Sequence, residues 1–335
     1  MDAAAESEMT VREAVSLALD QALAQDDRVL LLGEDIADPA GGVSGATAGL
    51  STKYGADRVL DTPISEAAIV GAAIGAALEG MLPVAEIMIM DFIGIAIDQI
   101  VNHAAKLRFM SGGRTSCPLT VRTAVFAGLG SGATHSQSLE AWFMHIPGLK
   151  VIVPSTPRDA KGLLTSAIFD PDPCVFVETV ITYGVRGPVP VDPAFSIPLG
   201  QADLKRPGSD VTVVTYGRGV FDALSAAEQL AAEGVDVEVL DLRTLVPLDT
   251  ERILESVGKT KRAVVAHYAT AFAGPGAEVA ATIAEGLFGE LRAPVQRVGA
   301  RFAPIPSSSV LEAAALPSAA AIIDAVRRTL GGPHG

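Results

Sequence analysis

The sequence predicts an α/β fold of two doubly wound domains, each built on a mostly parallel sheet. Short apolar runs alternate with longer helix-like segments along the chain, a pattern typical of parallel strands joined by covering helices. A stretch rich in Pro and Gly interrupts this alternation at residues 186–208, after which it resumes. The length of 335 residues is enough for two domains of ordinary size. We therefore expect one domain over residues 1–185, a linker over 186–208 and a second domain over 209–335.

The first domain opens with a helix. Thr10 and Glu13 have the spacing of a capping box, and the amphipathic segment after them runs to about Ala24. Ser65 suits the cap position of a second helix, Ala67–Leu78. A glycine-rich loop covers Gly41–Gly49. The remaining expected strands lie at residues 29–32, 83–88, 119–122, 149–153 and 174–178, and the remaining helices at 92–110, 138–144 and 159–169.

The second domain repeats the alternation after the linker. Apolar runs predict strands at residues 211–216, 235–240 and 263–265, and helix-like segments lie at 220–232, 250–257, 276–287 and 318–330. In an open parallel sheet, ligands bind where the carboxyl ends of strands lead into helices. We therefore expect functional residues at those turns.

The composition argues against two classes of partner. A net charge of −14 with no run of Lys and Arg leaves no basic patch for nucleic acid. No stretch of about 18 uncharged apolar residues appears, which is the length that a membrane span needs. Hydrophobic residues nevertheless make up 49% of the chain and charged residues only 19%. This apolar excess predicts large permanent subunit interfaces, which resemble a core cut in half.

Two features bear on the compartment. Cys117 and Cys174 lie in apolar, strand-like contexts, which predicts buried thiols in a reducing compartment rather than a disulfide or a metal pair. The segment Met1–Met9 is acidic and made largely of small residues, unlike a secretory or transit signal. Both features favour a cytoplasmic location.

Glu66 is the first candidate for acid–base chemistry. It stands beside the start of the helix over Ala67–Leu78, with Ile64 and Val70 close in sequence. An apolar environment raises the pKa of a carboxyl group and suits it to exchange a proton near neutrality. The alternative is that an acid in a first helical turn only complements the helix dipole.

His135 is the second candidate. It lies in the glycine-rich segment Gly128–Gln137, between an expected strand and an expected helix. Loops of this kind often present the polar residues of active sites. The alternative is a loop histidine bonded to a backbone carbonyl. His103 and His145 stand in helical or apolar surroundings and are interpreted as structural.

Three acids, Glu86, Asp91 and Asp98, interrupt apolar segments. Buried acids are normally paired, so we expect Lys106 or Arg108 to serve as their partner. No glycine-rich phosphate cradle followed by Lys and Ser or Thr is present, and no Asp and Asn pair suited to Mg²⁺ stands out. The sequence thus lacks a phosphate-binding motif of its own.

Several motifs together resemble the β subunits of the E1 components of 2-oxo acid dehydrogenase complexes, of the pyruvate, branched-chain and acetoin types. In the first domain these motifs are Asp61–Glu66, Glu86–Met88, Asp91–Phe92, Asp98–Ile100, Ala104–Lys106, Met110–Gly113, His135–Gln137, Ile146–Lys150 and Asp159–Leu163. In the second domain, Val211–Leu248 resembles the start of the transketolase-like C-terminal domain. The resemblance implies a pyrimidine-binding first domain and thiamine diphosphate as the coenzyme.

The resemblance also implies roles for individual residues. Glu66 matches the glutamate that hydrogen-bonds N1′ of the coenzyme's aminopyrimidine and promotes loss of the thiazolium C2 proton. Met88 and Phe92 match residues that pack on this ring, and Ile64 matches one that lines it. His135 matches the histidine near the substrate and the incoming lipoyl group, where it shuttles a proton.

Partners and ions follow from the same resemblance. In this family the α subunit holds the diphosphate and its Mg²⁺, so the absence of a phosphate motif from this sequence is expected. The resemblance also implies that a β chain has no catalytic activity without its α partner. The expected assembly is an α₂β₂ heterotetramer that acylates a lipoyl acyltransferase or another acyl carrier protein. Four backbone carbonyls match positions that hold a structural monovalent cation such as K⁺ in some members, those of Leu119, Ala167, Asp170 and Asp172.

Departures from the family pattern leave the substrate and the acceptor open. Ala266–Thr270 and Leu311–Ala313 differ from acidic motifs of the family in the domain that meets the acyltransferase core. The segments Glu86–Phe92 and His135–Leu139 favour the acetoin-cleaving branch. Two alternatives remain, a related transferase that loads a two-carbon unit onto a carrier protein and a non-catalytic scaffold subunit.

Overall fold

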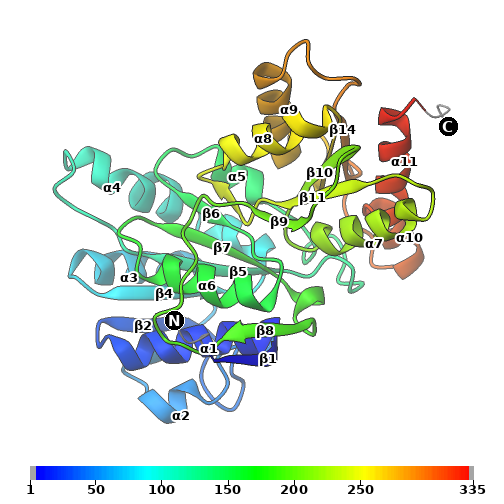
Figure 1. The fold of residues 1–335 in the computed structure, drawn as a ribbon. Coiled ribbons are helices and arrows are strands. Elements are labelled where there is room, and N and C mark those ends of the chain that lie inside the picture. Colours follow the sequence, from blue (N-terminus) through cyan, green and yellow to red (C-terminus); the bar gives the residue numbers. More distant parts are fainter. Residues whose placement is uncertain (1–4, 332–335) are drawn as a thin grey trace. The chain divides into compact units, whose positions relative to one another are not determined.

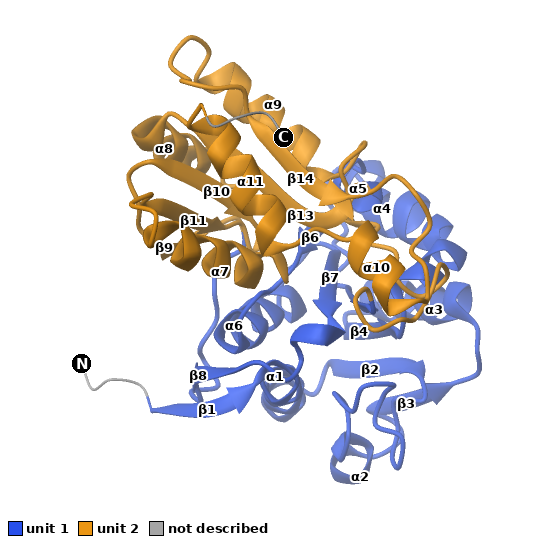
Figure 2. Cartoon of the chain, turned by 90° about the vertical axis from the view of Figure 1, so that its right-hand side faces the viewer, with its two compact units in different colours: residues 1–126, 142–199 blue, residues 127–141, 200–335 orange. Residues whose placement is uncertain are grey.

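The computed structural model describes residues 5–331 of the chain. Residues 1–4 and 332–335, which hold part of the acidic N-terminal segment and most of the C-terminal tail, lie outside the described residues. The chain divides into two compact units, coloured separately in Figure 2. Unit 1 comprises Met1–Phe126 and Trp142–Leu199, and unit 2 comprises Ala127–Ala141 and Gly200–Gly335. The segment that carries His135 therefore groups with unit 2.

Unit 1 is built on a parallel sheet whose strands run in the order β6-β7-β5-β4-β2-β3. These strands are β2 (Val29–Glu34), β3 (Val59–Thr62), β4 (Leu82–Ile87), β5 (Thr120–Val125), β6 (Lys150–Ile152) and β7 (Cys174–Thr179). A separate antiparallel pair joins β1 (Glu6–Thr10) to β8 (Arg186–Pro190). Parallel pairing throughout the larger sheet confirms the predicted α/β class.

The helices of unit 1 begin with the predicted capping box. In α1 (Val11–Gln25), the hydroxyl of Thr10 accepts from the amide of Glu13 across 3.1 Å. Buried residues of α1 and of α6 (Pro157–Ile168), such as Leu19 and Leu163, belong to one core with strands of the sheet. The other helices along this part of the chain are α2 (Leu50–Tyr54), α3 (Glu66–Leu78), α4 (Ala105–Met110), α5 (Glu140–Met144), α6 (Pro157–Ile168) and the 3₁₀ turn η3 (Val180–Thr182).

The prediction of a single helix over residues 92–110 is wrong. Three shorter elements take its place, namely the 3₁₀ helix η1 (Met90–Ile95), the π-helical turn η2 (Gln99–Ala104) and α4. Gly94 lowers the helix propensity of the first part. The 3₁₀ turn buries Met90 and Ile93, so tertiary packing overrides the apolar pattern on which the prediction rested.

Two further segments differ from expectation. Ser65 stands at the cap position of α3, but its side chain makes no capping hydrogen bond. Residues 186–208, expected as a linker, contain β8 and β9 (Asp203–Arg206). Proline is tolerated in strands that have a free edge. β8 lies in a two-stranded ribbon and β9 ends its sheet, so the Pro-rich segment still pairs.

Unit 2 contains a second sheet in the order β14-β13-β10-β11-β9, in which only β9 runs antiparallel to its neighbour. Its strands are β10 (Val211–Thr215), β11 (Val237–Asp241), β13 (Ala263–Thr270), β14 (Gln296–Ala300) and β9, with a short β12 (Thr244–Val246) between β11 and β13 in the chain. Its helices are α7 (Gly219–Ala231), α8 (Thr250–Thr260), α9 (Pro275–Gly286), α10 (Ser309–Ala315) and α11 (Ala319–Thr329). Small and branched residues of the sheet, α7 and α11 form the core, among them Val213, Ala226 and Val326.

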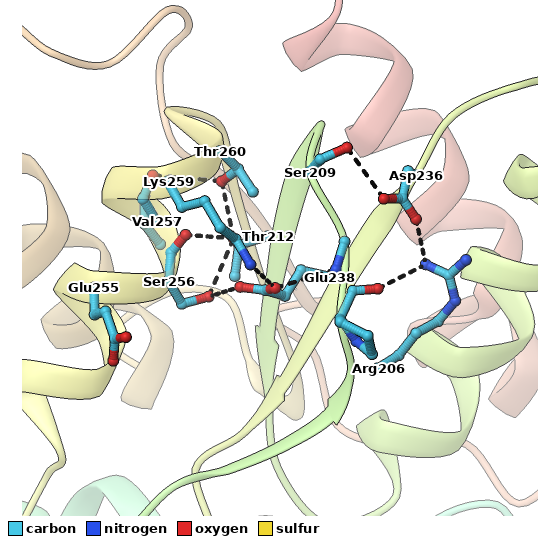
Figure 3. A network of polar contacts seen from close by, with 12 residues as sticks. Arg206, Ser209, Thr212, Asp236, Glu238, Glu255, Ser256, Val257, Lys259 and Thr260 are labelled. Carbon is cyan, nitrogen blue, oxygen red and sulfur yellow. Dashed lines mark hydrogen bonds and ion pairs between the residues drawn. The ribbon is translucent and has the colours of Figure 1, made fainter.

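A buried carboxylate network ties β11 to α8 within unit 2, as Figure 3 shows. Glu238 accepts from Oγ of Ser256 across 2.5 Å and from the amide of Gly208 across 3.1 Å. Lys259 of α8 completes the network with an ion pair. A buried carboxylate needs such partners because its desolvation is costly. This network therefore holds α8 against the sheet.

The segment Ser309–Thr329 meets the length and apolarity of a membrane-spanning helix. It consists of two helices, α10 and α11, separated at Pro317. Ile322 and Val326 of α11 are buried in the core of unit 2. Packing within the unit therefore accounts for part of this apolarity.

Candidate active site

The carboxyl ends of three neighbouring strands in unit 1 carry most of the candidate residues. In the register of the sheet, Gly33 of β2 lies opposite Asp61 of β3 and Glu86 of β4. β3 then leads into α3, and β4 leads into η1. Figure 1 labels β4 and α3, and Figure 2 also labels β3. The structure therefore brings the four residues that follow these strands to one edge of the sheet, namely Ile64, Glu66, Met88 and Phe92.

Glu66 is the first residue of α3, and only 6% of its surface is exposed. Val70 is buried on the same helix. At the end of β2, burial raises the pKa of Glu34, and the charges of Asp35 and Glu66 raise it further. Carboxyl groups that interact in this way favour retention of a proton. This edge of the sheet is thus suited to holding a proton.

Apolar side chains accompany the buried carboxyl group. Ile64, two residues before Glu66, is 76% exposed, whereas Met88 and Phe92 are half-buried. A branched aliphatic group, a thioether and a phenyl ring are suited to packing on a flat aromatic group. The residues present therefore fit an aminopyrimidine ring that lies against a buried carboxyl.

A small pocket is lined by Met88 and by a buried ion network. Arg122 of β5 donates to Glu86 across 2.6 Å and pairs with Glu178 of β7 across 2.7 Å. Tyr183 donates to Glu178 across 2.5 Å. Burial raises the pKa of Glu178. Burial also acts to lower the pKa of Arg122, but the negative charges of Glu178 and Glu86 outweigh it and raise that pKa. The guanidinium therefore stays charged between two carboxylates.

The partners predicted for Glu86 and Asp98 are wrong, and Asp98 instead contacts Asn102 and His103. Lys106 donates to a backbone carbonyl across 2.9 Å, and Arg108 pairs with Asp172. The partner of Glu86 is Arg122, which sequence reasoning missed. The available signal was a lone arginine inside the apolar strand β5, because a buried guanidinium requires a carboxylate.

In unit 2, His135 is half-buried in a series of turns that precedes α5. Its Nδ1 lies 3.1 Å from Oγ1 of Thr134, and its amide donates to the carbonyl of Gly132 across 3.3 Å. Both of these contacts lie within the loop that carries His135. His103 and His145, interpreted as structural, are exposed.

The four carbonyls expected to hold a monovalent cation lie just before β5, in the last turn of α6 and in the loop between α6 and β7. The carbonyl of Leu119 accepts from the amide of Cys174 across 2.8 Å, and that of Ala167 accepts from the amide of Asp170 across 3.3 Å. The carbonyl of Ala167 also accepts from the amide of Phe169, so backbone amides already occupy both of its lone pairs. The ammonium of Lys150 lies 2.6 Å from both carboxylate oxygens of Asp170. This loop therefore already contains one cationic partner.

Cys117 and Cys174 are buried free thiols, as predicted. Burial raises the pKa of Cys117 to about 11, which keeps it protonated and unreactive. Across residues 5–331, no group of three or more His, Cys, Asp and Glu side chains is arranged to hold a metal ion. Side-chain metal chemistry of that kind is therefore not built into the described part of the chain.

Known proteins of similar sequence cover nearly all of the chain. Residues 7–185 match the family described as "Transketolase, pyrimidine binding domain", and residues 200–322 match "Transketolase, C-terminal domain". The β subunit of acetoin:2,6-dichlorophenolindophenol oxidoreductase from Cupriavidus necator is 48% identical, over 97% of this chain and 99% of that protein. This chain belongs to the E1 β-subunit family of transketolase-like dehydrogenases.

Other members of the E1 β-subunit family are nearly as similar. The corresponding acetoin oxidoreductase subunit from Bacillus subtilis is 45% identical over 97% of this chain and 98% of that protein. The mitochondrial pyruvate dehydrogenase E1 β subunit from Caenorhabditis elegans is 45% identical over 97% of this chain and 94% of that protein. A solved structure titled "Split gene transketolase, inactive beta4 tetramer" has a TM-score of 0.78 at 24% identity and covers 96% of this chain and 98% of its own.

These comparisons confirm the family predicted from the motifs and the two-part transketolase-like fold. As an E1 β subunit, the chain is part of an oxidoreductase. The coenzyme of this family is thiamine diphosphate, which agrees with the fit of an aminopyrimidine to the edge of the unit 1 sheet.

Proposed function

We propose that this E1 β subunit acts with an α subunit to cleave acetoin or decarboxylate a 2-oxo acid, and that the acyl group passes to a lipoyl carrier. The observation that carries the proposal is the buried Glu66 carboxyl at the start of α3, at the same sheet edge as Ile64, Met88 and Phe92. Identity of 48% and 45% to two acetoin oxidoreductase β subunits favours acetoin as the substrate.

Thiamine diphosphate, when bound, supplies the electron sink for cleavage of a carbon–carbon bond next to a carbonyl. Glu66 holds a proton at N1′ of the aminopyrimidine, and its burial keeps water from competing for that proton. Met88 and Phe92 orient the ring through apolar contact, and Ile64 lines it. Burial and the neighbouring charges of Asp35 and Glu66 raise the pKa of Glu34 at the same edge.

His135 serves acyl transfer rather than bond cleavage in this proposal. An imidazole changes charge near neutral pH and so accepts and returns a proton in one catalytic cycle. Thr134 contacts Nδ1 across 3.1 Å, which restricts the rotation of the ring. His135 thereby delivers a proton while the acyl group moves to the carrier.

An α subunit completes the site. The described residues present no cluster of side chains for a metal ion, so we assign the diphosphate and its Mg²⁺ to the α chain. Large apolar side chains exposed on unit 1 offer surface for an α₂β₂ assembly, namely Ile64, Ile95, Phe109, Met110 and Trp142. Subunit naming of the bacterial relatives supports an α partner.

Two smaller proposals accompany this function. A monovalent cation such as K⁺ binds the backbone carbonyls of Leu119, Ala167, Asp170 and Asp172. The chain resides in the cytoplasm, which is supported by its buried free thiols and by its bacterial relatives.

A second candidate function is a transferase that loads a two-carbon unit onto a different carrier protein. The favouring observation is exposed apolar surface on α10 of unit 2, at Val310 and Leu311. The segment Ala266–Thr270, which departs from the family pattern, contains the buried His267. A non-catalytic scaffold has less support, because Glu66 and His135 are both retained.

The deciding experiment is a turnover assay of this chain co-expressed with an α subunit. The assay contains thiamine diphosphate, Mg²⁺ and a dye acceptor, with acetoin, a panel of 2-oxo acids and ketose phosphates as substrates. We expect coenzyme-dependent dye reduction with acetoin or an oxo acid that vanishes when the α subunit is omitted. Turnover with ketose phosphates alone would favour the transferase. Absence of all turnover in a complex that binds the coenzyme would reject the dehydrogenase.

A further inference from the structure

A buried carboxylate on α10 binds the glycine-rich loop that carries His135. Glu312 is only 3% exposed. Its Oε1 accepts from the amide of Gly128 and its Oε2 accepts from the amide of Gly130, each across 2.8 Å. All of these residues belong to unit 2. One side chain therefore satisfies two backbone donors at the start of the loop.

The loop also lies against the residues that precede α10. A Cβ atom on Gly130 would lie 3.2 Å from the carbonyl oxygen of Ser307, and one on Gly132 would lie 3.5 Å from the Ser307 Cβ. Gly128 and Gly130 have φ values of +95° and +72°, which side-chain-bearing residues rarely adopt. Glycine at these positions is what allows both amides to face the carboxylate.

The contact continues through the loop to the imidazole. After Gly130, the chain forms a turn in which the amide of His135 donates to the carbonyl of Gly132. The neighbouring hydroxyl of Thr134 then contacts Nδ1 of His135. These contacts connect the glycines at the start of the loop to the imidazole ring.

We propose that Glu312 is a positioning residue that fixes this loop and so sets the place of His135 for acyl transfer. The catalytic consequence rests on the proposed function of His135, whereas the structural step does not. Hydrogen bonds from amides to a buried carboxylate are charge-assisted and stronger than neutral ones. A carboxylate that binds both glycines leaves the loop little freedom to move.

The first test measures amide hydrogen exchange in peptides that span residues 127–141, in the complex with the α subunit. Glu312→Gln keeps the shape of the side chain but replaces one acceptor oxygen with an NH₂ group. This NH₂ group would face a backbone N–H donor, so one of the two hydrogen bonds would be lost. We expect exchange in this segment to rise by about tenfold. Glu312→Asp, which keeps the charge on a shorter side chain, should give a smaller rise and remains informative if the first variant assembles poorly.

Glu238→Gln is the matched control. Glu238 of β11 is also buried in unit 2 and accepts from a glycine amide, that of Gly208. Its other partners, Ser256 and Lys259, lie on α8 (Figure 3). This control should lower the melting temperature without raising exchange in residues 127–141. Unchanged exchange in Glu312→Gln, or an equal rise in both variants, would overturn the positioning role.

The second test separates acyl transfer from substrate cleavage. In Glu312→Gln we expect the carrier-dependent kcat to fall by about tenfold, while dye-coupled turnover and the KM for the substrate stay close to those of the wild type. Faster exchange with no change in the carrier-dependent rate would leave Glu312 as the anchor of the loop and would reject the role of His135 instead. The two failures are therefore distinguishable.

Discussion

Arg122 on β5 donates from Nη1 to Oε2 of Glu86 on the neighbouring strand β4, across 2.6 Å. The two residues are paired in the register of the sheet. Glu178 on β7 approaches the same guanidinium from the next strand. One cation thus holds two carboxylates at the sheet edge that leads to Met88.

We expect Arg122→Met to destabilise unit 1 by about 3–5 kcal/mol, because removal of the cation leaves two buried carboxylates without their partner. The measurement is urea unfolding at several pH values. The difference in unfolding free energy between wild type and variant should shrink as the pH falls from 8 to 5. Burial already raises the pKa of Glu178, and protonation removes its charge. Arg28→Met, which breaks an exposed ion pair with Asp26, should have little effect. A deficit of the same size at every pH would contradict this account.

Glu140 makes the stability of unit 2 depend on pH. Burial raises its pKa to about 7 from an ordinary value of 4.5, against an opposing hydrogen bond from its own amide. Between these values the folded chain retains a proton that the unfolded chain has lost. Stability from this group is therefore complete below pH 4.5 and is lost as the pH rises through 7, by at most about 3 kcal/mol.

Glu140→Gln should abolish this loss. We expect the difference in melting temperature between the variant and the wild type to move in favour of the variant as the pH rises from 5 to 8. Glu285→Gln, an exposed acid on α9, should show no such trend. A difference that does not vary with pH would mean that Glu140 is ionised at neutral pH in the folded protein.

Glu66→Gln should leave assembly with the α subunit intact and slow exchange of the C2 proton of bound coenzyme by about 100-fold or more, because an amide cannot donate and return a proton. The exchange is followed by NMR after a quench. Glu79→Gln, at the other end of α3 and exposed, is the control and should exchange at the wild-type rate. Near-normal exchange in Glu66→Gln would remove Glu66 from the mechanism.

His135→Ala should spare dye-coupled turnover and lower acyl transfer to the carrier by about 100-fold. Both rates are measured on the same preparation of the assembled enzyme. His145→Ala, which removes an exposed histidine, should change neither rate. Equal loss of both activities in His135→Ala would place His135 in the cleavage step.

Local patterns predicted much of the fold. The capping box of Thr10 and Glu13 appears at the start of α1, and the apolar runs became the buried strands of two sheets. These features depend on residues that are close in sequence. The prediction of one helix over residues 92–110 was wrong because burial of Met90 and Ile93 decided the local geometry of this segment. Burial is set by distant parts of the chain.

In the candidate site, too, some features could be predicted from local sequence and others could not. By itself, the sequence determined the family, the parallel α/β architecture and the burial of Glu66 in an apolar helix start, since motif spacing and hydrophobic period are local properties. Only the tertiary structure decided that Arg122 pairs with Glu86 and that Glu312 binds Gly128. These partners lie 36 and 184 residues apart in the chain. No local pattern records such pairs, because strand order and helix packing bring the donors and acceptors together.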